Sequence, residues 1–248
     1  MRPGFIDCPK GRLAYNQVEG EGPGVLWLGG FRSDMTGTKA SRLADWAAEK
    51  RRSFLRFDYS GHGQSDGAFE DGCISDWFAD ARFIFDRLTE GPQILVGSSM
   101  GGWIACLLAL ARPQRVAGIV FIAPAPDFTE ELMWKGMSAA DREALLREGR
   151  LKPPSDYSPE PDVITSKLIE DGRDNLVFPR AGDITCPVRI LQGMKDRDVP
   201  WRHAMRLAEA LGATDLRVTL TGDGDHRLSS PADLERLIAA VDEIAAAI

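Results

Sequence analysis

Ser99 lies at the centre of a pattern that is typical of an activated serine nucleophile. The chain reads G-S-S-M-G from Gly97 to Gly101, with glycine two positions before and two positions after Ser99. Small residues at these positions let a strand and the following helix approach closely enough to expose the central hydroxyl. Ser98 would have Val96 and Met100 at the same positions, so the spacing selects Ser99 as the candidate nucleophile.

A serine hydroxyl needs a base that takes its proton, and the chain has three histidines. His62 precedes the serine and lies in a glycine-rich turn. His203 lies one turn into a predicted helix, where we expect a surface or packing role. His226 follows the last predicted strand in the loop G-D-G-D-H. Its place after the serine, in a loop at the expected sheet edge, makes His226 the predicted base.

The third member of such a set is a carboxylate that orients the histidine and stabilises its charged form. The segment after the penultimate predicted strand reads Q-G-M-K-D-R-D-V-P from Gln192 to Pro200 and contains two aspartates. We predict that Asp196, three residues after Gly193, is the acid. Asp198 would instead pair with a neighbouring cation or cap the helix that is predicted to begin near Trp201.

Acyl transfer to a serine also needs two backbone N–H groups that stabilise the oxyanion. Met100 follows the nucleophile directly and opens the next predicted helix, so its amide is the first predicted donor. Phe31 follows Gly29-Gly30 at the end of another predicted strand. We predict that its amide is the second donor.

The apolar pattern predicts the elements that position these residues. Strands alternate with helices, which predicts an α/β fold with a mostly parallel sheet and helices on both faces. We expect the first two strands to be neighbours. The predicted strands span residues 12–19, 25–28, 53–59, 94–96, 118–122, 187–192 and 216–220, and the predicted helices span residues 35–50, 74–88, 103–110, 201–211 and 233–248.

Residues 127–182 interrupt this alternation. They are rich in charge, proline and short helical pieces, without a strand-like run. We expect them to form a small helical cap inserted into a single domain of residues 1–248. The basic residues Arg147, Arg150 and Lys152 are predicted to form a solvated helix face rather than an attractant for an anionic substrate.

Composition limits the partners. The formal charge of -7 and the pI near 5.1 argue against nucleic acid or an anionic membrane as the main partner. No segment approaches the roughly 20 apolar residues of a membrane span, and no secretory signal is visible, so we expect a cytoplasmic protein without stable membrane association. The four cysteines lack C-x-x-C spacing, so neither a metal site nor a disulfide framework is predicted, and Cys106 is expected in the core.

These motifs together resemble the α/β-hydrolase superfamily over essentially the whole chain. R-F-D-Y-S-G-H-G-Q-S-D-G matches its D-x-x-G-x-G-x-S turn, and G-S-S-M-G-G-W matches its nucleophile elbow. More narrowly, the chain resembles the α/β-hydrolase-domain-containing group that includes a mitochondrial palmitoyl-protein thioesterase and acyl-glucuronide esterase, with bacterial relatives. That resemblance rests on G-T-K-A (37–40), G-P-Q-I-L-V-G-S-S-M-G-G-W, C-P-V-R-I-L-Q-G-M-K-D, V-P-W and, in the insertion, P-S-D-Y-S (154–158).

The resemblance implies an eight-stranded sheet and places the family's catalytic residues on Ser99, Asp196 and His226. It implies a serine hydrolase, without cofactor or metal, that cleaves carboxylic ester or acyl thioester bonds through an acyl-enzyme on Ser99. The expected partner is a small-molecule ester or thioester, or an acylated protein, and no oligomeric state is predicted. The alternatives are a peptidase or carbon–carbon bond hydrolase with the same residues, and a non-catalytic receptor for a small ligand.

Overall fold

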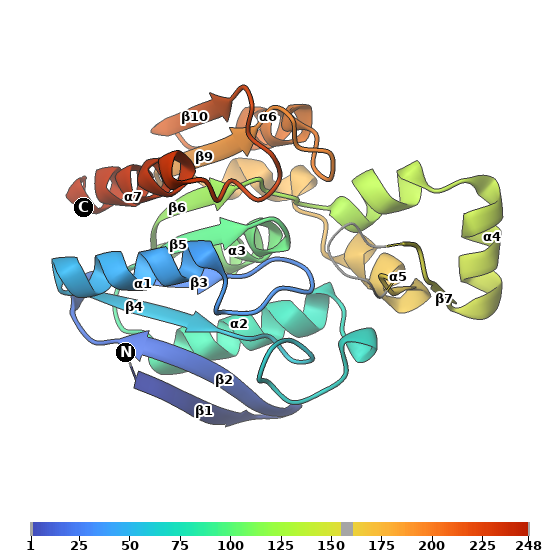
Figure 1. Cartoon of the computed structure of the whole chain (residues 1–248), viewed down its shortest axis with the longest axis horizontal. Coiled ribbons are helices and arrows are strands. Elements are labelled where there is room, and N and C mark those ends of the chain that lie inside the picture. Colours follow the sequence, from blue (N-terminus) through green and yellow to red (C-terminus); the bar gives the residue numbers. More distant parts are fainter. Residues whose placement is uncertain (1, 155–160, 248) are drawn as a thin grey trace.

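Eight strands form one sheet through the centre of the molecule (Figure 1). The computed structural model describes residues 2–154 and 161–247. The strand order is β1-β2-β4-β3-β5-β6-β9-β10. Neighbouring strands from β4 to β10 run parallel, whereas β2 pairs antiparallel with both β1 and β4. The strands are β1 (Arg2–Cys8), β2 (Gly11–Val18), β3 (Glu21–Leu28), β4 (Arg52–Phe57), β5 (Gln93–Ser98), β6 (Val116–Ile122), β9 (Val188–Gly193) and β10 (Leu216–Thr221).

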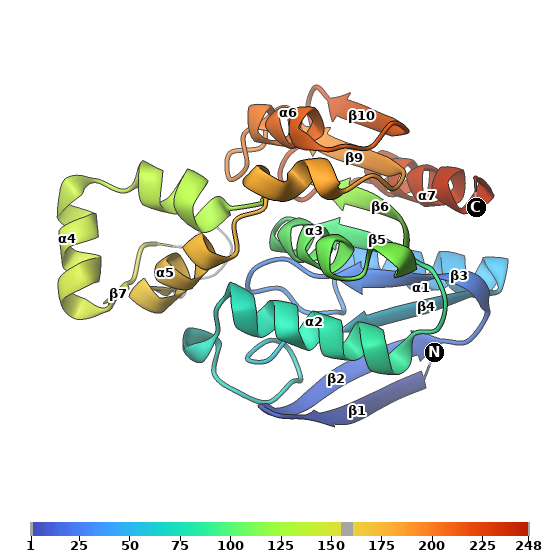
Figure 2. The same ribbon diagram turned by 180° about the vertical axis from the view of Figure 1, so that it is seen from behind.

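Helices cover both faces of the sheet, as the alternation of strands and helices predicts. On one face lie α1 (Thr38–Lys50) and α7 (Pro231–Ala246), in front in Figure 1. On the other lie α2 (Ile74–Leu88), α3 (Met100–Ala111) and α6 (Trp201–Ala210), in front in Figure 2. Two short 3-10 turns, η1 (Phe69–Asp71) and η2 (Pro113–Arg115), flank α2 and α3.

Each face of the central strands buries its own apolar cluster. In β3, Val25 and Trp27 pack on the α1 and α7 side, whereas Leu26 and Leu28 pack on the α2 and α3 side. Successive side chains of a strand point to opposite faces, and both faces here are covered, so the strand is apolar throughout. None of the helices in the described part of the chain is long and apolar enough to be a membrane-crossing segment.

Two details of the sheet differ from the sequence-based expectation. The first two predicted strands are not neighbours, because β4 lies between β2 and β3. The crossover from β3 through α1 brings β4 parallel to β3 and fills the position that a hairpin partner would take. Residues 2–8 form an unpredicted edge strand. Pro3 and Gly4 have low strand propensity, which hides this strand in the sequence. An edge strand tolerates a proline because only one of its sides is paired.

An insertion between β6 and β9 extends away from the carboxyl edge of the sheet (Figures 1 and 2). The insertion has a small apolar cluster of its own, formed by Leu145, Ile164 and Ile169. The expectation that the insertion has no strand is wrong, because β7 (Arg150–Leu151) and β8 (Ile164–Thr165) pair antiparallel. Each of these strands has only two residues, which is too short for an alternating apolar pattern in the sequence. Residues 155–158 of the P-S-D-Y-S motif lie outside the described residues. The insertion contains η3 (Thr129–Trp134), α4 (Ala139–Glu148), β7 (Arg150–Leu151), β8 (Ile164–Thr165), α5 (Ser166–Asp174) and η4 (Phe178–Asp183).

Hydrogen bonds fix the insertion to the sheet domain at its base. The buried Asp127 carboxylate accepts from the Val177 amide (2.7 Å) and the Phe178 amide (3.0 Å), which joins the two ends of the insertion. The Trp103 indole of α3 donates to the Asn175 carbonyl oxygen (2.9 Å). These bonds hold the part of the insertion nearest to the sheet.

The turn from β5 to α3 leaves no space for a side chain at either of its two glycines. A Cβ atom on Gly101 would lie 2.0 Å from the Leu28 carbonyl oxygen, and one on Gly97 would lie 2.4 Å from the Gly101 oxygen. Both obstacles are backbone atoms, which cannot move aside as a side chain can. The two glycines therefore set the distance between β3, β5 and α3.

We predict that Gly101→Ala lowers the free energy of unfolding by about 3 kcal/mol or more, because the methyl group has no space in this turn. Gly136→Ala is the matched control, since nothing lies within 4 Å of a Cβ atom there. We expect the control to change stability by less than about 1 kcal/mol. Chemical denaturation of the three proteins measures both values, and equal stabilities would refute the prediction.

Candidate active site

Ser99 lies between the end of β5 and the start of α3, in a strained backbone conformation. Its φ of 55° and ψ of -119° are rare for a residue with a side chain. The Ser99 amide donates to the Ile122 carbonyl oxygen (2.9 Å), and the Ser99 carbonyl accepts from the Gly102 amide (2.8 Å) and the Ala125 amide (3.1 Å). Bonds to both neighbouring segments hold the conformation that sharply turns the chain at the hydroxyl.

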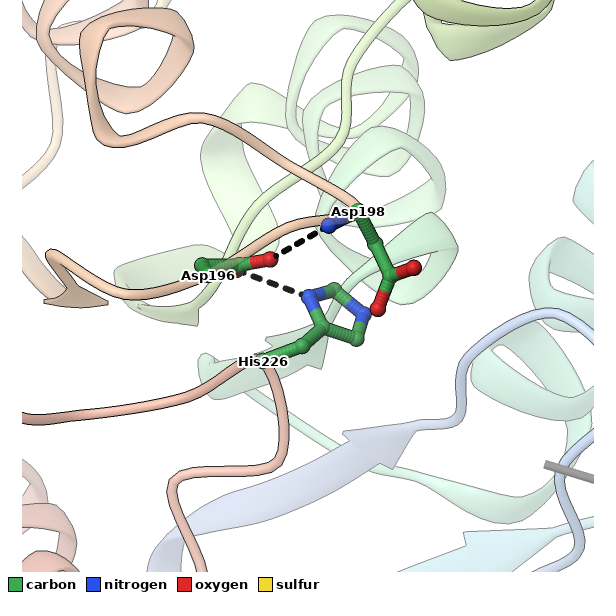
Figure 3. Close-up of side chains that lie close together, drawn as sticks. All are labelled: Asp196, Asp198 and His226. Atoms are coloured by element: carbon green, nitrogen blue, oxygen red, sulfur yellow. Dashed lines mark hydrogen bonds and ion pairs between the residues drawn. The ribbon is translucent and has the colours of Figure 1, made fainter. Parts of the chain in front are cut away.

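The structure brings the three predicted side chains into one hydrogen-bonded chain. The His226 Nε2 atom lies 3.1 Å from the Ser99 Oγ atom. On the other side of the ring, Nδ1 lies 2.8 Å from Asp196 Oδ2, and Figure 3 shows this pair. A ring nitrogen that faces a carboxylate carries the proton, so Nδ1 donates and Nε2 accepts from the serine. Ser99 follows β5, Asp196 follows β9 and His226 follows β10, so all three lie at the carboxyl edge of the sheet.

Asp196 is held by more than the histidine. Its side chain is fully buried, and Oδ1 accepts from the amides of Asp198 (3.0 Å) and Val199 (2.8 Å). Its Oδ2 also accepts from the Gln192 Nε2 atom (3.0 Å). Gln192 is fully buried at the end of β9 and was missed in the sequence, where nothing distinguishes it from other strand residues. These donors fix the carboxylate orientation that the histidine needs.

The loops that carry the acid and the base are joined directly. The Met194 amide donates to the Thr221 oxygen (2.8 Å), and the Lys195 amide donates to the Gly224 oxygen (2.9 Å). A Cβ atom on Gly193 would lie 2.4 Å from the Gly224 oxygen. The loop after β9 therefore rests on the loop after β10, which sets the distance from Asp196 to His226.

Asp198 has neither the acid's position nor the predicted capping role. Helix α6 begins after Pro200 without a side-chain cap, and Asp198 lines the cleft beside His226. Within the described residues, Asp196, Asp198 and His226 form the one cluster whose ligand atoms, within 4.8 Å of one another, have metal-binding spacing (Figure 3). The Asp196 oxygens already accept from four donors, so we assign the cluster to hydrogen bonding.

The two predicted oxyanion donors belong to segments that lie next to the serine. Met100 opens α3, and first-turn amides of a helix have no acceptor within the helix. The segment before Phe31 passes close to the serine, because a Cβ atom on Gly30 would lie 3.4 Å from Ser99 Cβ. Phe31 and Ser99 both line the same cleft. The arrangement gives an oxygen bound at Ser99 two backbone segments as neighbours.

A cleft of about 690 Å³ opens above the serine, between the sheet edge and the insertion. Its volume is in the range of small-molecule sites. Its lining includes the apolar side chains of Phe128, Leu132, Met133, Ile164 and Val199. It also includes the polar side chains of Ser33, Thr38, Lys39, Arg227 and Ser229. Arg147, Arg150 and Lys152 are absent from the lining; Arg147 pairs with Glu148 and Arg150 with Glu70.

Lys39 lines the cleft but is not among the predicted site residues, although it belongs to the G-T-K-A motif. Its ammonium group donates to the carbonyl oxygen of Arg227, the residue after His226. Burial lowers the pKa of Lys39 to about 8, and the neighbouring Asp225 carboxylate opposes that shift. The side chain therefore ties the start of α1 to the histidine loop.

The other two histidines are structural, in agreement with the packing role expected for His203. His203 is 7% exposed, and its Nε2 atom donates to the Pro126 oxygen (2.8 Å). His62 is 4% exposed, with Nδ1 3.2 Å from the Ser60 oxygen and Nε2 3.3 Å from the Arg32 amide. Burial lowers the pKa of both, that of His62 to about 4. Cys106 is buried in the core as predicted.

Comparisons with known proteins agree with this fold. The family model described as serine aminopeptidase S33 matches residues 28–167. The mitochondrial palmitoyl-protein thioesterase ABHD10 of Bos taurus is 36% identical over 233 residues, which cover 94% of this chain and 76% of the relative. The Homo sapiens protein is 35% identical over the same shares.

Two solved structures superpose over almost the whole chain. A putative hydrolase from Agrobacterium vitis S4 has a TM-score of 0.93 and 44% identity, with 98% of both chains covered. Mouse alpha/beta hydrolase domain-containing protein 10 has a TM-score of 0.91 and 33% identity, again with 98% of both chains covered. The sheet, the helices on its two faces and the insertion thus recur in relatives of known structure.

Acid should destabilise the protein through His62. The unfolded chain takes up a proton near pH 6.5, whereas the folded ring does so only near pH 4. Between these values the unfolded state binds more protons, so the free energy of unfolding falls as the pH falls. From pH 6.5 to pH 5 we expect this residue to account for a loss of about 2 kcal/mol.

Denaturation of the wild type and of His62→Phe across that range measures the effect. The variant lacks the titrating ring, so from pH 6.5 to pH 5 its free energy of unfolding should fall by about 2 kcal/mol less than that of the wild type. Parallel curves for the two proteins would contradict the assignment of a neutral, buried His62.

Proposed function

The chain belongs to the α/β-hydrolase family, and we propose that it is a serine hydrolase that cleaves carboxylic ester or acyl thioester bonds through an acyl-enzyme on Ser99. The observation that carries the proposal is the hydrogen-bonded chain from Ser99 through His226 to Asp196 at the floor of the cleft. A serine hydroxyl is a weak nucleophile alone, and this chain supplies both its base and the group that orients the base.

In the proposed first step, the Ser99 oxygen attacks the substrate carbonyl while the His226 Nε2 atom takes the serine proton. Asp196 stabilises the resulting imidazolium and keeps its own charge. The carbonyl electron pair moves to the oxygen, which the Phe31 and Met100 amides stabilise. His226 then donates its proton to the leaving alcohol or thiol, the bond to that group breaks, and an acyl-enzyme remains.

The proposed second step returns the enzyme to its starting state. A water molecule in the cleft gives a proton to His226 Nε2, and its oxygen attacks the acyl carbonyl. The second tetrahedral intermediate collapses, the ester bond to Ser99 breaks, and the proton returns from His226 to the serine oxygen. The products are a carboxylic acid and the free enzyme, and water is the only reactant consumed in this step.

The lining of the cleft supports an amphiphilic substrate. Its apolar side chains, several of which come from the insertion, suit an acyl chain, and its polar side chains suit a hydrophilic leaving group. The relatives of Bos taurus and Homo sapiens are named palmitoyl-protein thioesterases, which supports an acyl thioester, or an acylated protein, as the substrate here too.

A matched substrate panel tests the function. It contains short- and long-chain oxygen esters, the thioesters of the same acids, a peptide and a carbon–carbon bond substrate. We expect turnover of esters or thioesters, and a loss of at least about 10³-fold in kcat for Ser99→Ala, because the nucleophile is gone. Turnover of the peptide alone, or of the carbon–carbon substrate alone, would contradict the proposed ester or thioester specificity and identify the protein as a peptidase or a carbon–carbon bond hydrolase.

The panel also separates an enzyme from a receptor. Tight binding of an ester by the wild type without any turnover would contradict the proposal and favour a ligand-binding protein. Ester hydrolysis that survives in Ser99→Ala would contradict the acyl-enzyme mechanism, whatever the substrate.

Two aspartates two residues apart provide an internal control for the role of the acid. We expect Asp196→Asn to lower kcat by about 10³- to 10⁴-fold, since an amide cannot stabilise the imidazolium or select the reactive ring tautomer. Asp198→Asn should change kcat less than about 10-fold, because the hydrogen bond that Asp198 gives to Asp196 comes from its backbone amide, which the substitution keeps. Comparable losses in the two variants would show that the acid is misassigned.

A further inference from the structure

His62 is a buried histidine that the proposed reaction does not use, yet it adjoins the loop that carries Phe31. Its backbone is fixed on both sides, since its amide donates to the Tyr59 oxygen (2.9 Å) and its oxygen accepts from the Ser65 amide (3.0 Å). Three aromatic rings surround the imidazole edge-on, with centroid distances of 5.6 Å to Tyr59, 5.1 Å to Phe69 and 5.2 Å to Trp77. The ring cannot turn without displacing them.

The two ring contacts of His62 are compatible with one neutral tautomer. Nδ1 faces the Ser60 carbonyl oxygen, which can only accept, so Nδ1 carries the proton. Nε2 faces the Arg32 amide, which can only donate, so Nε2 is an acceptor. Burial keeps the ring neutral, with a pKa of about 4, and the nearby Arg32 cation acts in the same direction.

The segment that His62 contacts determines where the Phe31 amide points. The Gly30 carbonyl oxygen accepts from the Ser33 amide (3.2 Å) and from the Ser33 hydroxyl (2.8 Å). A trans peptide is planar, so its N–H points away from its carbonyl, and fixing the Gly30 oxygen fixes the direction of the Phe31 N–H. The next amide, that of Arg32, is the one that His62 accepts.

Arg32 needs such support because its backbone is in the left-handed region, with a φ of 56°. Its side chain is also anchored, through the guanidinium group, to the Pro161 oxygen (3.0 Å) and to Asp162 Oδ1 (2.8 Å) in the insertion. The turn beside Phe31 is therefore held at the Arg32 amide by His62 and at the Arg32 side chain by the insertion.

We propose that His62 is a positioning residue for the oxyanion site: by accepting the Arg32 amide, it holds the turn in which the Phe31 N–H faces the reacting oxygen at Ser99. This inference rests on the proposed function, because it assigns a partner to the oxyanion donor of that reaction. His62 itself contacts no reacting atom.

An alkyl trifluoromethyl ketone separates oxyanion binding from substrate binding. The Ser99 oxygen adds to its carbonyl carbon, the serine proton passes to His226, and the carbonyl electron pair becomes an oxyanion that no leaving group relieves. His62→Phe keeps an aromatic ring in the pocket and removes the acceptor. We expect kcat for the preferred ester to fall, and Ki for the ketone to rise, by a common factor of roughly 10 to 100, with KM changed less than about 3-fold.

His203→Phe is the matched control, because it also replaces a buried, hydrogen-bonded histidine but contacts Pro126 rather than the Phe31 loop. In this control we expect Ki and kcat to stay within about 3-fold of the wild type. His62→Gln, which offers an amide oxygen as acceptor, should recover part of the loss. Unchanged kcat and Ki in His62→Phe, or equal losses in the His203 control, would overturn the inference.

A second measurement needs no variant of His62. Nitrogen NMR of the wild-type imidazoles should show His62 as the neutral Nδ1–H tautomer between pH 5 and pH 8, free and with the ketone bound. An Nε2–H tautomer, or protonation near pH 6.5, would overturn the inference even if His62→Phe failed to fold.

Adduct formation in Ser99→Ala separates a failure of this inference from a failure of the proposed function. If the wild type forms no adduct that depends on Ser99, the proposed function is refuted. If the wild type forms the adduct and His62→Phe has the same Ki and kcat, only the positioning role is refuted.

Discussion

The left-handed backbone of Ser99 is the constraint on which the rest of the site depends. A side-chain-bearing residue adopts a φ of 55° only where its surroundings impose it, and here three backbone hydrogen bonds do so, to Ile122 of β6, to Ala125 just after β6 and to Gly102 of α3. Gly97 and Gly101 let strand and helix meet at that point without a clash. Because the chain turns so sharply, the hydroxyl stands clear of the sheet edge and reaches a histidine from a distant strand.

Each partner of Ser99 comes from a loop that is itself fixed by neighbouring strands. The loops after β9 and β10 are bonded to each other, and Gln192 and two amides orient the Asp196 carboxylate. On the other side, His62 and Ser33 hold the turn that contains Phe31. The geometry at the serine is thus preorganised by parallel strands, while the insertion supplies several of the apolar side chains that line the cleft.

The chemistry-bearing residues were predictable because their patterns are local. Glycine spacing around Ser99, a histidine after the last strand and an aspartate three residues after Gly193 need no tertiary information. Contacts between distant segments were not predictable in the same way. The insertion of β4 between β2 and β3 depends on the handedness of a crossover, and the Gln192 and His62 contacts depend on which loops meet. The weak signal of β1 reflects its edge position, where one set of hydrogen bonds suffices.

If Ser99 carries the acyl group during turnover, rapid-quench mass spectrometry will detect that group on its peptide. The wild-type protein is mixed with a slowly hydrolysed ester, quenched in acid within milliseconds and digested. We expect a mass increase equal to the acyl group on the peptide that contains Ser99, together with a burst of leaving group equal to the enzyme concentration. An acyl group on another residue, or a burst that persists in Ser99→Ala, would contradict the proposed acyl-enzyme.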